Sequence, residues 1–239
     1  MTGTISENLI NVFDRIRKAA RKAGRDPMEV TLVAVTKTVD VKKIKEAISG
    51  GARVFGESYI QEAEEKIEKI KDKSVRWHFI GHLQKNKAKF AVDLFDVIES
   101  IDSLELAEVI SKRAQEPVDI MLEVNLAKEK TKTGVDAEGA VKLARAISNL
   151  PNLRLKGLMT IPPFFEAPEM SRPYFVALRR LAERINKERI PGVFLKELSM
   201  GMSNDFEVAI EEGATIIRIG TAIFGTRKEA PDKKALKAS

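Results

Sequence analysis

A lysine at the end of a wholly apolar run is the residue best placed to do chemistry in this sequence. Lys37 directly follows the β-branched run from Val30 to Thr36, whose composition is that of a strand buried on both faces. Burial favours the neutral amine of a lysine, and a neutral amine can form a Schiff base with an aldehyde. Alternatively, the long side chain carries a hydrated ammonium at the edge of the fold. The neighbours of Lys37 have to decide between these two interpretations.

Two short segments near the end of the chain combine glycine with hydroxyl side chains. They contain Ser199, Gly201 and Ser203 in the first segment and Gly220 and Thr221 in the second. Backbone N–H groups beside small residues can bind a phosphate. One such loop alone is better explained by turn and helix-capping chemistry, and Asp205 nearby would repel an anion. Two of them after consecutive strands favour a phosphate site.

Arg218 lies in the otherwise apolar run from Thr215 to Ile219. A guanidinium is always charged and needs a partner when it is buried. It could pair with a carboxylate on an adjacent strand, or it could donate a hydrogen bond to the ring nitrogen of a pyridine ligand. In the second case the nitrogen stays unprotonated, and the ring becomes a poorer electron sink.

His78 and His82 are four residues apart and could be read as a metal pair. Gly81 interrupts the segment between them, and the sequence offers no third ligand nearby, so we predict no metal site. We expect His82 to line the mouth of a pocket instead.

The spacing of apolar residues predicts an alternation of short strands and amphipathic helices. A first helix spans residues 4–23, and eight strand-like runs follow it. The strands are predicted at 30–36, 53–55, 77–80, 95–98, 118–124, 154–158, 196–199 and 215–219, with helices that include 59–70, 104–114, 137–148 and 173–186. This pattern predicts an α/β protein with a single (β/α)8 TIM barrel and an extra N-terminal helix, a doubly wound open sheet being the alternative. We expect one domain over residues 1–226 and a basic C-terminal tail over residues 227–239.

Closure of the barrel brings the candidate site residues together. The first and last strands of a closed barrel pair, so Lys37 becomes a neighbour of the segments that follow the seventh and eighth strands. A small molecule with an aldehyde at one end and a phosphate at the other fits that arrangement. Pyridoxal 5′-phosphate (PLP) is the common cofactor of this description.

Composition excludes several functional classes. The chain has no cysteine, which removes disulfides, thiolate metal sites and thiol nucleophiles. Its 41 basic and 35 acidic residues give a net charge of +6, but the two signs intermix, so we predict no nucleic-acid partner. Because the first 25 residues lack the apolar block of a signal peptide or membrane span, we predict no membrane partner and a cytoplasmic protein.

Six sequence blocks span nearly the whole chain and are recognisable together: Ala34–Thr38, Phe55–Glu57, His78–Lys87, Gly157–Met159, Leu198–Ser203 and Arg218–Gly225. They resemble the pyridoxal phosphate homeostasis protein family. The resemblance implies a barrel like the N-terminal domain of alanine racemase, with PLP bound to Lys37 as a Schiff base. It also implies that Ser199, Gly201, Gly220 and Thr221 hold the phosphate and that Arg218 lies near the ring nitrogen.

The predicted cofactor-binding set is completed by Met159, His82, Ser58, Met200 and Ser203. Ser58 stands where the family usually has asparagine, and Asn204 stands where an acidic residue is usual.

The resemblance favours a carrier over an enzyme. Racemases of the related barrel type use a second, β-rich domain with a catalytic tyrosine, whereas this sequence has only Tyr59 and Tyr174 and no length for that domain. We expect a monomer that binds PLP reversibly, buffers its concentration and passes it to apo-enzymes, without robust turnover. The alternative is a PLP-dependent amino-acid racemase of low activity.

Overall fold

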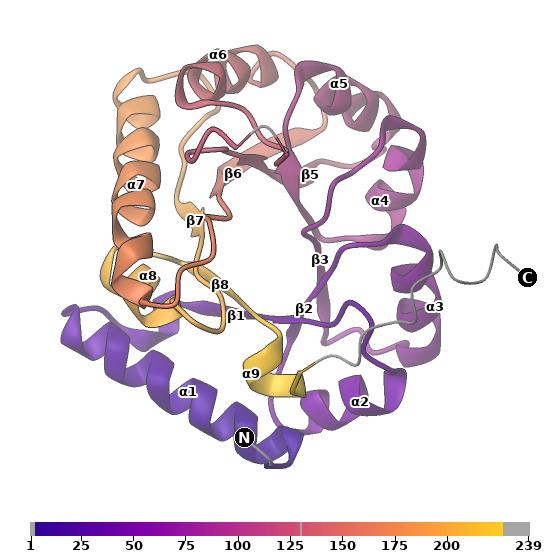
Figure 1. Ribbon diagram of the computed structural model, residues 1–239. Coiled ribbons are helices and arrows are strands. Elements are labelled where there is room, and N and C mark those ends of the chain that lie inside the picture. The colour runs from indigo at the N-terminus through magenta and orange to yellow at the C-terminus, as the bar shows by residue number, and fades with distance from the viewer. Residues whose placement is uncertain (1–2, 130, 227–239) are drawn as a thin grey trace, which may run out of the picture.

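The protein is a closed barrel of eight parallel strands, paired in the order β1 to β8. A computed structural model gives this fold and describes residues 3–129 and 131–226. Helices surround the strands (Figure 1). The predicted (β/α)8 barrel is confirmed, and the open sheet is wrong because β1 pairs with β8. The predicted tail at 227–239 lies outside the described residues.

The strands and helices alternate along the chain after the first helix. The strands are β1 (Thr31–Val35), β2 (Val54–Glu57), β3 (Arg76–Phe79), β4 (Val97–Ile101), β5 (Val118–Glu123), β6 (Leu153–Met159), β7 (Glu197–Ser199) and β8 (Ile216–Ile219). The helices are α1 (Ile5–Lys22), α2 (Val41–Ser49), α3 (Ile60–Ile70), α4 (Ala88–Leu94), α5 (Leu104–Arg113), α6 (Ala137–Ile147), α7 (Arg172–Lys187), α8 (Phe206–Glu211) and α9 (Thr221–Phe224), with 3-10 turns η1 (Pro27–Glu29), η2 (Lys85–Lys87) and η3 (Pro168–Ser171).

Strand β4 departs most from the predicted boundaries. It begins at Val97 and not at Phe95, because Phe95 caps the end of α4 and packs edge-on against Phe79. Asp96 is also taken out of the strand, since its carboxylate accepts a hydrogen bond of 2.7 Å from the backbone N–H of Trp77. The apolar pattern had merged the end of the helix with the start of the strand.

The extra N-terminal helix covers the outside of the barrel where it closes. A capping box between Thr4 and Glu7 starts α1, and its buried face carries Leu9, Val12 and Ile16. The helix packs on α8, α9 and α2 (Figure 1). Within residues 3–129 and 131–226, no helix is long and apolar enough to cross a membrane.

The pairing of β1 with β8 fixes which loops meet at the carboxyl end of the barrel. Its register joins Val33 to Arg218 and Ala34 to Ile219. Since both strands run in the same direction, the residues that follow them emerge side by side. Lys37 is therefore brought beside Gly220 and the residues after it, although the two segments are far apart in sequence.

Candidate functional site

Some of the predicted site residues line one cavity at the carboxyl ends of the strands. This cavity, which we call the Arg218 cavity, has a volume of about 300 Å³. Six residues expected from the sequence line it, namely Lys37, Ser58, Ser203, Arg218, Gly220 and Thr221. Its size falls at the lower end of the range for small-molecule sites. The structure thus brings an amine, a guanidinium and two hydroxyl-bearing loops to one space.

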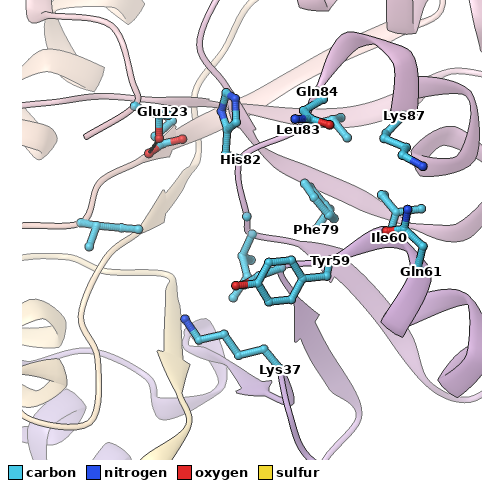
Figure 2. A pocket seen from close by; sticks show the side chains of 15 residues that line it. Lys37, Tyr59, Ile60, Gln61, Phe79, His82, Leu83, Gln84, Lys87 and Glu123 are labelled. Atoms are coloured by element: carbon cyan, nitrogen blue, oxygen red, sulfur yellow. Dashed lines mark hydrogen bonds between the residues drawn. The ribbon is translucent and has the colours of Figure 1, made fainter. Parts of the chain in front are cut away.

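Lys37 lies at the junction of two cavities. Its side chain is half-buried and points into the space bounded by His82, Tyr59 and Glu123 (Figure 2). Together with Ser58 it also lines the Arg218 cavity. The lysine is therefore accessible from either space.

The loops after β7 and β8 supply polar groups at the other end of the Arg218 cavity. Ser203 and Thr221 both line it, and the Ser203 hydroxyl accepts a hydrogen bond of 3.3 Å from the N–H of Ala222. Among the hydrogen bonds of the described residues, none uses the backbone N–H of Ser203, Asn204 or Thr221. The carboxylate of Asp205 is turned to its own loop and accepts the N–H of Met202 at 2.7 Å. Free N–H groups and hydroxyls of this kind suit an anion.

Arg218 is almost fully buried and has two direct partners. One terminal nitrogen of its guanidinium donates to the Ser199 hydroxyl at 2.5 Å, and the other donates to the carbonyl of Thr160 at 2.8 Å. Glu99 lies 4.0 Å away. A guanidinium has five donors, so Arg218, which also lines the cavity, retains donors for a ligand.

The partner that balances Arg218 comes from across the barrel. Glu99, on β4, accepts hydrogen bonds from the Ser199 hydroxyl at 2.5 Å and from Nδ1 of His78 at 2.6 Å. Burial alone would raise the pKa of the Glu99 carboxyl, but the contacts with His78, Arg218 and Ser199 together hold it below its usual value. Burial also disfavours the charged form of Arg218 and so lowers its pKa, whereas the negative charges of Glu99, Glu123 and Asp205 act in the opposite direction. The carboxylate and the guanidinium stabilise each other as charged groups.

Several predicted residues support the cavity without lining it. The Ser199 hydroxyl is fully buried and is engaged by Glu99 and Arg218. Met159 and Met200 are also fully buried. Gly201 has φ of 92°, and a Cβ there would lie 2.5 Å from the Cβ of Ala209, so the backbone requires glycine. Cofactor contacts from these four residues stay predictions.

His82 lines a second cavity, which we call the His82 cavity, of about 560 Å³. Its side chain is about half exposed and lies 3.7 Å from Asp102. Glu123 also lines this cavity (Figure 2) and accepts a hydrogen bond from the Thr133 hydroxyl at 2.7 Å. Burial raises the pKa of Glu123, and the charge of Asp102 adds to this.

The two histidines belong to separate networks. His78 is buried against Glu99, whereas His82 faces the cavity beside Asp102. Within the part of the chain that the structure describes, no cluster of three or more His, Cys, Asp or Glu residues could hold a metal ion.

The buried carboxylate was the functional residue that sequence reasoning missed. Glu99 interrupts the apolar strand Val97–Ile101, which is the same signal that singled out Arg218. Of the two alternatives for Arg218, a carboxylate on an adjacent strand is wrong, because Glu99 lies on β4 and the strands beside β8 are β7 and β1. The carboxylate reaches Arg218 through the interior of the barrel.

Comparison with known proteins settles the family. Residues 8–228 match the family described as alanine racemase, N-terminal domain. Over 225 residues the chain is 47% identical to the pyridoxal phosphate homeostasis protein of Aquifex aeolicus, covering 93% of this chain and 98% of that protein. The chain belongs to the pyridoxal phosphate homeostasis protein family. The Escherichia coli member is 41% identical over 233 residues, covering 93% of this chain and 97% of the relative.

Solved structures of related proteins have the same fold as this chain. PipY of Synechococcus elongatus, solved with PLP bound, has a TM-score of 0.81 and 35% identity and covers 93% of this chain and 100% of its own. Alanine racemase of Corynebacterium glutamicum has a TM-score of 0.70 at 18% identity and covers 92% of this chain and 62% of its own. The racemase likeness shows the fold, which is the barrel expected from the sequence.

The Glu99 carboxylate should stabilise the barrel to an extent that depends on pH. A carboxyl whose pKa is lowered on folding contributes stability above its ordinary value of 4.5, and that contribution is lost as the pH falls through the lowered pKa. Glu99→Gln leaves Arg218 without its counter-charge, so we expect the free energy of unfolding to fall by about 2–3 kcal/mol at neutral pH.

Urea unfolding of both proteins over a pH series measures this effect. The difference in the free energy of unfolding between the unmodified protein and Glu99→Gln should become smaller as the pH falls below 4.5. Glu105→Gln is the matched control, because Glu105 pairs with Lys85 on the exposed surface and should change stability little. A gap between Glu99→Gln and the unmodified protein that stays constant with pH would contradict the charged state assigned to Glu99.

Proposed function

We propose that the protein carries PLP as a Schiff base on Lys37 and maintains the supply of PLP in the cell, without robust catalytic turnover of its own. The observation that carries the proposal is the convergence of Lys37, Arg218 and Thr221 on one cavity. Its family supports it, because the relatives are named pyridoxal phosphate homeostasis proteins and the PipY structure contains PLP.

The chemistry of the Arg218 cavity matches the functional groups of PLP. When bound, PLP supplies an aldehyde that reacts reversibly with an amine, and Lys37 supplies that amine. The apolar side chains of Val35, Ile80 and Ile161 offer surfaces for a flat ring. At the far end, Thr221 and the loop at Ser203 would hold the phosphate.

Arg218 would act on the electronics of the ring. A charged guanidinium beside the ring nitrogen donates a hydrogen bond to it and disfavours its protonation. Glu99 and Ser199 hold the guanidinium in place. A ring whose nitrogen stays unprotonated beside it withdraws electrons less strongly. This property suits a carrier better than a racemase, which has to stabilise a carbanion.

The proposal extends to how PLP is used. A reversible covalent bond lets the protein buffer the free aldehyde and release it to PLP-requiring apo-enzymes. We further propose that the protein acts as a monomer in the cytoplasm.

The covalent bond is tested at Lys37. Borohydride reduces Schiff bases, so treatment of the PLP-loaded protein should fix a pyridoxyl group on Lys37, as read by peptide mass spectrometry. Lys37→Ala should abolish the absorbance of the Schiff base and keep the circular dichroism of the folded barrel. Lys42→Ala is the control, because this lysine is exposed on α2. A pyridoxyl group found on another lysine would refute the assignment.

The phosphate end is tested by the paired variant Ser203→Ala and Thr221→Val. Both hydroxyls line the Arg218 cavity, so their loss should weaken binding of PLP about tenfold or more, while binding of pyridoxal, which lacks phosphate, should change little. Equilibrium dialysis with each ligand gives the two affinities. Equal losses for both ligands would remove the phosphate role from these residues.

Turnover is tested with amino acids that carry deuterium at the α-carbon. A carrier without racemase activity should release no α-deuteron in a saturable way, which proton NMR follows directly. Saturable release at an ordinary enzymatic rate of about 1 s⁻¹ or more would establish the racemase alternative.

A further inference from the structure

The turn that carries Lys37 is tied to helix α3 by a buried ammonium. The side chain of Lys66 is 6% exposed. Its nitrogen donates to the carbonyl of Thr36 at 2.6 Å, to Oε1 of Glu57 at 2.7 Å and to Oε1 of Glu62 at 2.6 Å. An ammonium has three N–H donors, so every donor of Lys66 is used. A fully partnered, buried lysine of this kind fixes geometry.

Both neighbours of Lys37 are held by this network. The Thr36 hydroxyl donates to Oε1 of Glu57 at 2.6 Å, and the Thr38 N–H donates to Oε1 of Glu62 at 2.5 Å. Thr38 has φ of 63°, which is a strained conformation for a β-branched residue. Such a conformation persists only where the surroundings enforce it, and here Glu62 supplies the enforcing contact.

This strained turn determines the direction in which Lys37 leaves the backbone. On one side of Lys37 the carbonyl of Thr36 accepts the Lys66 ammonium, and on the other side the Thr38 N–H donates to Glu62. Without that bond, Thr38 would relax toward an extended conformation and rotate the peptide. The amine would then be withdrawn from the position at which an aldehyde in the cavity meets it.

The network places charged groups where burial is electrostatically unfavourable. Glu57 is fully buried, and its Oε2 has no hydrogen-bond partner among the described residues. Burial raises the pKa of its carboxyl, against the opposing charge of Lys66. Apolar side chains would fill the same space at lower electrostatic cost. The charged groups nevertheless gather around the one turn that presents Lys37.

We propose that Glu62 and Lys66 are positioning residues for Lys37, which hold the turn 36–38 in the strained shape that directs the amine into the cavity. The proposal rests on the proposed function, because it concerns how tightly the aldehyde of PLP is captured. Neither residue lines the Arg218 cavity or the His82 cavity, so they act on a ligand indirectly, through the turn that carries Lys37.

The test compares PLP with pyridoxine 5′-phosphate, which has the same ring and phosphate but an alcohol in place of the aldehyde. Glu62→Ala should weaken PLP binding about tenfold, the equivalent of one lost hydrogen bond to a charged group. The alcohol should bind the variant as it binds the unmodified protein. Glu65→Ala is the matched control, because Glu65 lies on the exposed face of α3 and pairs with Lys69 at 3.6 Å. It should change neither affinity.

A glycine at position 38 separates positioning from general packing. Glycine adopts a positive φ without strain, so Thr38→Gly in the Glu62→Ala background should recover part of the lost PLP affinity. A packing defect at Glu62 would not be recovered in this way. Lys66→Met should weaken PLP in the same direction, and where this variant fails to fold, the Glu62 and Thr38 variants decide.

The outcomes distinguish this inference from the proposed function. If the unmodified protein binds PLP no more tightly than the alcohol, covalent capture by Lys37 is wrong. If it prefers PLP and Glu62→Ala keeps that preference, only the positioning role is wrong. An equal loss of both ligands, or no recovery with glycine, would also overturn the positioning role.

Discussion

The pairing of β1 with β8 is the constraint on which the rest of this structure depends. It joins Val33 to Arg218 and Ala34 to Ile219, and the order of the other strands follows around the ring. A parallel strand pair places both carboxyl ends at the same edge. For this reason, Lys37 and Thr221 line one cavity, although the two residues are far apart in the sequence. In an open sheet with the strands in the same order, Lys37 and the loop after β8 would lie at opposite sides of the sheet.

Two buried charge networks adjoin residues that line the cavity. On one side, the chain of contacts from Arg218 through Ser199 to Glu99 and His78 joins four strands through the barrel interior. On the other side, Lys66 joins α3 to the ends of β1 and β2. Buried charges such as these contribute little net stability compared with apolar packing. Their concentration around one cavity indicates that the fold gives up some stability to keep the guanidinium and the amine in defined positions.

Much of this arrangement could be predicted from the sequence. Short runs that are apolar on both faces gave the strands and helical spacing gave the helices, apart from the start of β4, where a helix cap and a strand share one apolar run. Lys37, Arg218 and Thr221 could be recognised because each is a polar exception at or near the end of a buried strand. Glu99 carries the same local signal, but its partner lies across the barrel, and no sequence spacing reports contacts through an interior. The phosphate contact expected of Ser199 stays a prediction, and its hydroxyl also contacts Glu99 and Arg218, two contacts that sequence spacing does not report.

By itself, the sequence determined the alternation of strands and helices, the closed topology that this alternation favours, and the residue types able to bind an aldehyde and an anion. These properties are local, because hydrophobic periodicity and side-chain chemistry are written residue by residue. Only the tertiary structure decided which polar groups face the cavity and which are used to hold others in place. That choice depends on the geometry across the barrel and around the turn at Thr38, where a distance of a few tenths of an ångström separates a hydrogen bond from an unsatisfied group.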